Sequence, residues 1–392
     1  MTRQISASRN KLLFTKTLLV FYFNFALIAS VVTLMYKCLG QKSSNLILIA
    51  FFSIFLLLEL ALRIIKSRSL PNSVENKKRR ESARFDDFET IKMIEPHQNI
   101  SYLTREFWDE MQRFTGQGSV TKIKSSDGTR IFDAKEIDGN YISAKDGFRQ
   151  TTDRPQSPDG RVFVFGGSTV YCFEVPDSMT VCSFLQRNLN ESGKNLEVVN
   201  LGISGASVAN RVEKLKTMNS MCEQDIVIFL FGVNDIGWDH FYGSQNTFLK
   251  VIRNFGKVSL SFSWFYYEQS VNIRKSNAES AAHRTIKQLK DVSDFLNTRK
   301  ILHKFILQPN IYTKRNTNNY EDQIVLKFGA ELNDTVLHAY RVFKNCQYPP
   351  YITATHIIDN TETSVYLDWA HANAEGNKLI ANFISELDLF KR

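Results

Sequence analysis

The sequence has few cysteines, and none of them stand in a paired arrangement. The 392-residue chain holds five, with no Cys-x-x-Cys spacing: Cys38, Cys172, Cys182, Cys222 and Cys346. Thiolate metal sites need closely spaced cysteines, and disulfide frameworks use even numbers of them. The pattern therefore predicts reduced thiols and argues against both a metal site and a disulfide scaffold.

The main body of the chain lacks an excess of charge. Residues 1–82 hold 13 Lys and Arg against 3 Asp and Glu, whereas residues 83–392 hold 36 against 37. A nucleic-acid-binding surface needs positive charge on the folded part of the protein. The sequence therefore predicts no nucleic-acid partner, and the basic N-terminus indicates a membrane.

Two long apolar runs occupy residues 17–39 and 45–65. Each is longer than the roughly 18–20 residues that span a bilayer. The first has no small-residue cleavage site and is followed at once by the second, which argues against a cleaved signal peptide. Residues 1–66 are therefore predicted to be a helical hairpin that anchors the chain in membrane lipid. A pair of buried soluble helices is the alternative.

Basic residues flank the two runs on their outer sides. By the positive-inside rule, both ends of the hairpin face the cytoplasm, and the body of the protein with them. The residues that give this orientation are Arg3, Arg9, Lys11 and Lys16 before the first run, and Arg63, Lys66, Arg68 and Lys77 to Arg80 after the second.

The remainder divides into three parts. Residues 67–83 form a basic linker, and residues 84–159 form a lead-in segment that packs on the domain after it. Residues 160–392 alternate short apolar runs with helical stretches, which predicts an α/β domain with a parallel sheet and helices on both faces. In such sheets ligands bind beyond the carboxyl ends of the strands.

Small and polar residues follow three of the predicted strands. Gly166 and Gly167 precede Ser168, Gly202 ends the second strand, and Asn234 follows the third. Each motif alone is also typical of an ordinary turn. Near the C-terminus, Asp368 precedes His371 by three positions. At that spacing the carboxylate can accept Nδ1–H of the imidazole and leave Nε2 free to take a proton from a serine.

The ordered set Gly-Gly-Ser-Thr, Asn-Leu-Gly, Gly-Val-Asn-Asp and Asp-x-x-His resembles the four blocks of the SGNH/GDSL hydrolase superfamily, over roughly residues 162–390. The segments 146–149 (Asp-Gly-Phe-Arg) and 175–177 (Val-Pro-Asp) resemble its membrane-linked members. Gly167 stands where the literal Gly-Asp-Ser-Leu motif has Asp. The Gly-x-Ser-x-Gly motif of the α/β-hydrolase fold is absent from the sequence.

The resemblance implies a flavodoxin-like three-layer fold and assigns a role to each motif. Ser168 would be the nucleophile, His371 the general base and acid, and Asp368 the residue that orients His371. The amides of Ser168 and Gly202 and the side chain of Asn234 would form the oxyanion hole. The implied reaction is acyl transfer through an acyl-enzyme, without a metal or an organic cofactor.

The resemblance also predicts the class of substrate. The expected activity is hydrolysis of O-acyl or O-acetyl esters on a small molecule or glycan, or on a lipid-linked substrate. An O-acyltransferase with the same triad and a non-catalytic membrane-bound binding protein are the alternatives. An aromatic-rich insertion at about 236–277 is either a lid over the strand ends or a surface that packs elsewhere.

Overall fold

The computed structural model describes residues 100–117, 120–124, 130–236, 260–328, 330–346, 348 and 350–391. The predicted membrane anchor, the basic linker, the start of the lead-in and residues 237–259 of the insertion lie outside them. Within the described ranges, no helix is both long enough and apolar enough to cross a bilayer.

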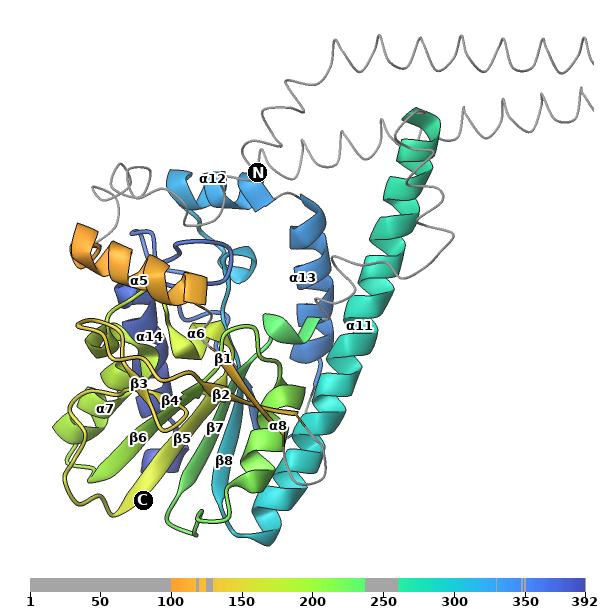
Figure 1. The fold of residues 1–392 in the computed structure, drawn as a ribbon. Helices are drawn as coiled ribbons and strands as arrows, with labels where there is room; N and C mark the ends of the chain where they lie inside the picture. Colours follow the sequence, from red (N-terminus) through yellow and green to blue (C-terminus); the bar gives the residue numbers. More distant parts are fainter. Residues whose placement is uncertain are drawn as a thin grey trace, which may run out of the picture. The chain divides into compact units, whose positions relative to one another are not determined.

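A seven-stranded sheet with the order β3-β4-β6-β5-β7-β8-β9 forms the centre of the domain (Figure 1). Its five parallel strands are β5 (Gly160–Gly166), β6 (Leu196–Gly202), β7 (Ile226–Phe231), β8 (Leu302–Leu307) and β9 (Tyr351–Thr353). Numbered along the chain, they stand in the spatial order 2-1-3-4-5, which is the flavodoxin-like order. The predicted α/β class with a mostly parallel sheet is confirmed.

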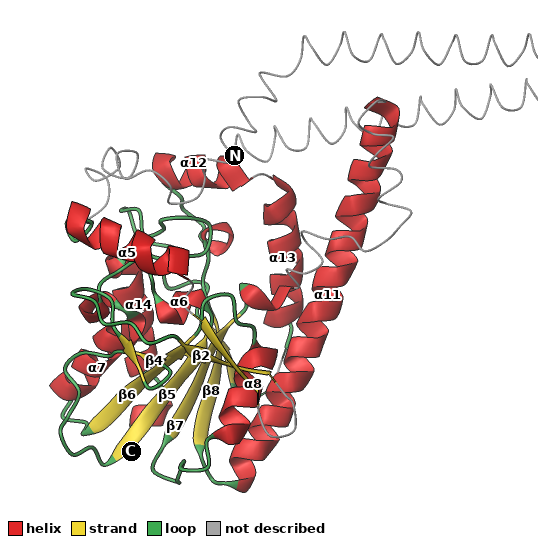
Figure 2. Cartoon of the chain, in the orientation of Figure 1, coloured by secondary structure: helices red, strands yellow, loops and turns green. Residues whose placement is uncertain are grey.

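Helices cover both faces of the sheet (Figure 2). On one face, α7 (Val181–Glu191) and α14 (Ala374–Ser385) pack against each other. On the other face, α8 (Val208–Thr217) shares a hydrophobic core with α11 (Leu260–Thr298), α12 (Asn319–Phe328) and α13 (Ala330–Lys344). All six residues of β7 are buried, because the strand is apolar throughout and lies between the two layers.

Helix α11 (Leu260–Thr298) extends into the aromatic-rich insertion, of which residues 260–277 are helical. Between β8 and β9 the chain forms two helices, α12 (Asn319–Phe328) and α13 (Ala330–Lys344).

The described part of the lead-in is integrated into the domain. It contains helix α5 (Arg105–Gln117), the antiparallel hairpin β1 (Val120–Lys124) and β2 (Arg130–Ala134), and the short strands β3 (Ala144–Lys145) and β4 (Phe148–Arg149). Strand β4 pairs antiparallel with β6 and so extends the main sheet. Apolar residues of α5 share a core with α7 and α14, and Figure 1 shows α5 at the same end of the sheet as α6.

Candidate active site

Ser168 stands at the carboxyl end of the central strand β5. It is the first residue of the short helix α6 (Ser168–Tyr171), which follows Gly166 and Gly167 directly. A Cβ at Gly166 would collide with the side chain of Val170, so only glycine lets the chain turn this tightly into the helix. As the first residue of a helix, Ser168 has an amide without an intrahelical acceptor.

Asp368 and His371 lie in the loop between β9 and α14. The amide of Leu367 donates to the carbonyl of His371 at 2.9 Å, which closes the loop on itself. Oδ1 of Asp368 accepts the amides of Ala370 and His371, both at 2.7 Å. The loop backbone therefore fixes the carboxylate in place.

The three residues predicted as a triad are in direct contact. Nδ1 of His371 lies 2.7 Å from Oδ2 of Asp368, and Nε2 lies 2.8 Å from Oγ of Ser168. In this arrangement the imidazole can accept the serine proton while the carboxylate stabilises the resulting positive charge.

The electrostatics of the pair suit that proton transfer. Burial by itself would raise the pKa of Asp368, but the charge of His371 and hydrogen bonds from His371 and Ala370 lower that pKa below its ordinary value. Burial by itself would lower the pKa of His371, whereas the negative charges of Asp368 and Glu174 raise it above the ordinary range. Both carboxylates therefore stabilise the positively charged imidazole that forms when His371 takes the serine proton.

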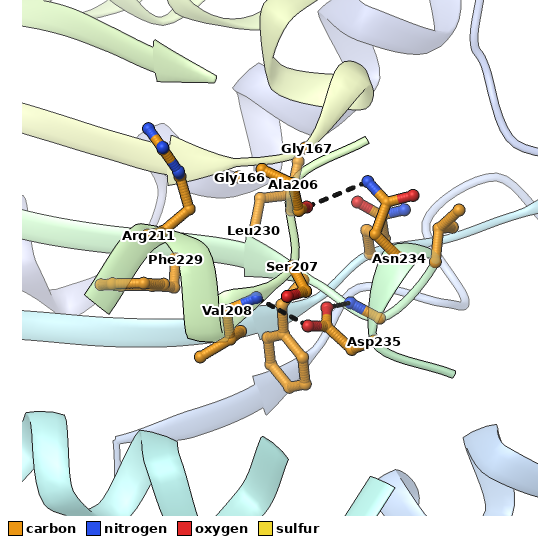
Figure 3. Close-up of a pocket in the computed structure, with 14 residues that line it drawn as sticks. Gly166, Gly167, Ala206, Ser207, Val208, Arg211, Phe229, Leu230, Asn234 and Asp235 are labelled. Carbon is orange, nitrogen blue, oxygen red and sulfur yellow. Dashed lines mark hydrogen bonds between the residues drawn. The ribbon is translucent and has the colours of Figure 1, made fainter. Parts of the chain in front are cut away.

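Asn234 reaches the same point from the neighbouring strand β7. Its Nδ2 donates to the carbonyl of Ala206 at 3.1 Å and packs against Gly167, where a Cβ would collide with it (Figure 3). Asp235 accepts the amides of Val208 at 2.7 Å and Gly232 at 2.9 Å, so it joins the turns after β6 and β7. Burial raises the pKa of Asp235 to about 6, although these two hydrogen bonds act in the opposite direction.

Gly202 does not occupy the position that its predicted role requires. Its amide donates to Oδ1 of Asn200 at 2.9 Å, and a Cβ here would collide with the backbone of Tyr171. The glycine is needed because helix α6 crosses β6 closely, and its amide is already used. The expectation that Gly202 is an oxyanion donor is therefore corrected.

Two residues near the site were missed by sequence reasoning. Gly205 lies in the exposed turn after β6 with φ of 74°, and its amide has no protein acceptor among the described residues. Its signal in the sequence was the second glycine of the Gly-Ile-Ser-Gly segment that begins with Gly202, the last residue of the strand. Glu174 lies with Oε1 3.6 Å from Nε2 of His371. No sequence pattern marked that carboxylate.

Together, the flavodoxin-like parallel sheet and the Ser–His–Asp contact at its carboxyl edge define a serine hydrolase. The chain belongs to the GDSL-like lipase/acylhydrolase family, whose sequence model matches residues 162–384. It is thus a hydrolase that acts on ester bonds, and the resemblance found in its four sequence blocks is confirmed. In the described part of the chain, no group of three or more His, Cys, Asp or Glu residues is arranged to hold a metal ion.

Three solved structures illustrate what this chain is similar to. The crystal structure of the acetyl xylan esterase AlAXEase is 16% identical, covers 57% of this chain and 97% of its own, and has a TM-score of 0.34. A G-D-S-L family lipolytic protein from Veillonella parvula is 15% identical over 58% and 98% of the two chains, with a TM-score of 0.34. TesA is 13% identical over 58% and 99%, with a TM-score of 0.32. No curated protein matches the chain significantly.

Proposed function

We propose that this protein is a serine esterase that removes O-acyl groups, such as O-acetyl groups, through an acyl-enzyme on Ser168. The observation that carries the proposal is the continuous hydrogen-bond chain from Asp368 through His371 to Ser168, with steps of 2.7 and 2.8 Å. A protein that kept this fold only for binding would have no need for that alignment.

In the first step Oγ of Ser168 attacks the ester carbonyl while Nε2 of His371 takes the serine proton. The tetrahedral intermediate then collapses, the carbon–oxygen bond to the alcohol breaks, and Nε2 returns the proton to the departing oxygen. Water attacks the acyl-enzyme in the second step by the same route and releases the free acid. Transfer to a sugar hydroxyl differs only in the acceptor.

Three donors converge on the developing oxyanion in this mechanism. Two are those expected from the sequence, the amide of Ser168 and the side chain of Asn234. The third is the amide of Gly205 in place of Gly202. The turn that holds Gly205 continues to Ala206, whose carbonyl binds Asn234 at 3.1 Å. Gly205 is therefore the chain neighbour of the residue that binds the Asn234 side chain, and its amide has no acceptor among the described residues.

We further infer that residues 1–66 anchor the protein in a membrane and that the catalytic domain faces the cytoplasm. The two apolar runs and the distribution of Lys and Arg in the sequence support this arrangement. A membrane location fits an acylated carbohydrate or a lipid-linked molecule as substrate. In inside-out vesicles the domain is expected to be accessible to protease, and protection there would overturn the orientation.

The catalytic proposal is tested by active-site labelling. The detergent-solubilised protein should react with a fluorophosphonate probe and hydrolyse short-chain aryl esters, and Ser168→Ala should abolish both. Ser178→Ala is the matched control, because Ser178 is exposed and lies outside the triad. Absence of Ser168-dependent labelling and of ester hydrolysis would overturn the proposal. Products formed in the presence of a sugar acceptor distinguish hydrolysis from acyl transfer.

A further inference from the structure

Glu174 places a second carboxylate beside the reacting atoms. Its Oε1 lies 3.6 Å from Nε2 of His371, the same nitrogen that lies 2.8 Å from Oγ of Ser168. The side chains of Glu174 and His371 are 13% and 21% exposed, so both are partly open to solvent. A substrate bound to Ser168 therefore lies within reach of this carboxylate.

The backbone holds Glu174 firmly in this position. Cys172 ends helix α6 in the left-handed conformation, with φ of 55°, and returns the chain toward the site. The buried guanidinium of Arg149 donates to the carbonyls of Cys172 at 3.2 Å and of Val175 at 2.9 Å. These two carbonyls flank Glu174 on either side, so the position of its carboxylate is built into the fold.

Several carboxylates of the domain pair with a cation or accept backbone amides. Asp177 pairs with Arg149 at 2.5 Å, and Glu321 pairs with the fully buried Lys314 at 2.8 Å. Glu110 accepts three backbone amides, at distances of 2.8 to 2.9 Å. Within the described ranges, the one ion-pair contact of Glu174 is with the catalytic imidazole. This contact places the Glu174 carboxylate at the catalytic imidazole.

We propose that Glu174 is a substrate-binding residue that accepts a hydrogen bond from a hydroxyl group on the alcohol part of the ester. The alcohol part is the one concerned, because Nε2 of His371 must reach the departing alcohol oxygen and Glu174 lies 3.6 Å from that nitrogen. The substrates are then esters of polyhydroxylated alcohols, such as acylated sugars. This inference rests on the proposed esterase activity.

The chemistry of the site favours a neutral hydroxyl over other groups. A carboxylate only accepts hydrogen bonds, and an apolar substituent would remove its water without supplying a donor. An anionic substituent would be repelled. A cationic substituent would pair with Glu174 but would lie close to His371 as that ring becomes positively charged in the transition state, which costs energy. A hydroxyl satisfies the carboxylate without opposing the imidazolium.

The test compares two acetates of similar size, methyl 6-O-acetyl-glucopyranoside and cyclohexylmethyl acetate, which lacks the hydroxyls. The full-length protein in detergent should show kcat/KM about 10-fold or more higher for the sugar ester, the factor expected of one hydrogen bond to a charged group. In Glu174→Leu this preference should fall to near one. Glu375→Leu removes an exposed carboxylate four positions after His371 and should keep the preference.

Each result decides the proposal. A preference near one in the wild-type protein would overturn it without any variant, and so would a preference that Glu174→Leu leaves intact. Acetylcholine and 3,3-dimethylbutyl acetate form a second pair, which differs in the positive charge of the alcohol part. A preference for acetylcholine that depends on Glu174 would show that this residue binds a cationic group and not a hydroxyl, and would refute the assignment. If no ester is hydrolysed in a Ser168-dependent way, the proposed function itself fails. Hydrolysis without hydroxyl preference overturns the role of Glu174 alone.

Discussion

Replacing Glu174 by glutamine removes one of the two negative charges that raise the pKa of His371. At 3.6 Å, two unit charges interact by about 1 kcal/mol in bulk water and by about 4–5 kcal/mol at an effective dielectric constant of about 20. The pair is partly exposed, so the lower half of this range applies. One pKa unit corresponds to about 1.4 kcal/mol, and the pKa of His371 should therefore fall by about 1–2 units.

The sign of the effect on activity follows from the role of His371 as a base. Only the neutral imidazole accepts the serine proton, so the acidic limb of the kcat/KM profile reports its pKa. Loss of the Glu174 charge should move that limb to lower pH. At pH values below the wild-type pKa of His371, kcat/KM should rise by about 10-fold or more. Aryl acetate hydrolysis across the pH range, at constant ionic strength, measures this shift, with Glu375→Gln as control. A limb that stays in place or moves to higher pH would refute the electrostatic reasoning.

Three other predictions concern the surroundings of the triad. Asn234→Ala should lower kcat for aryl esters by about 10²–10³ through loss of an oxyanion donor, and Gly167→Ala should give part of the same loss because its Cβ displaces the Asn234 amide. The two losses should be strongly non-additive in the double variant, and full additivity would contradict the shared mechanism. Arg149→Ala leaves Asp177 without its cation and should lower the free energy of unfolding by about 3–5 kcal/mol in denaturant titrations. For Asp235, the folded-state pKa of about 6 exceeds the value of 3.8 for a free carboxyl, so its stabilising contribution is complete below about pH 4 and is lost as pH rises through 6. Asp235→Asn should remove this pH-dependent loss of stability, so the difference in melting temperature between pH 4 and pH 7 should become smaller. A difference equal to that of the wild-type protein would contradict the prediction.

The triad was predictable because its parts follow elements that the sequence defines locally. Strand β7 and residues 162–165 of β5 are continuous apolar runs, so the ends of both strands could be located in the sequence. A parallel sheet places those ends at one edge. The contact of Asp368 with His371 depends on only three intervening peptide bonds. Ser168 and His371 are therefore in contact, although 203 positions separate them in the sequence.

The structure of the lead-in was not predictable in the same way. Strands β3 and β4 have two residues each, too few for a pattern of alternation, and they exist because β4 pairs with the edge of β6. Helix α5 does carry apolar residues at helical spacing, with Phe107, Met111 and Phe114 all buried.

The oxyanion donors show a further limit of sequence reasoning. Every residue except proline has a backbone amide, so nothing in the sequence distinguishes an amide that is free from one that is bonded. Here the side chain of Asn200 explains why the amide of Gly202 is not free. Its Oδ1 accepts a hydrogen bond from that amide at 2.9 Å, and its Nδ2 donates to the carbonyl of Val170 at 2.9 Å. One buried asparagine thus fastens helix α6 to β6 and removes Gly202 from the catalytic donors. Asn200→Ala should therefore reduce activity by loosening Ser168, even though its side chain contacts none of the reacting atoms.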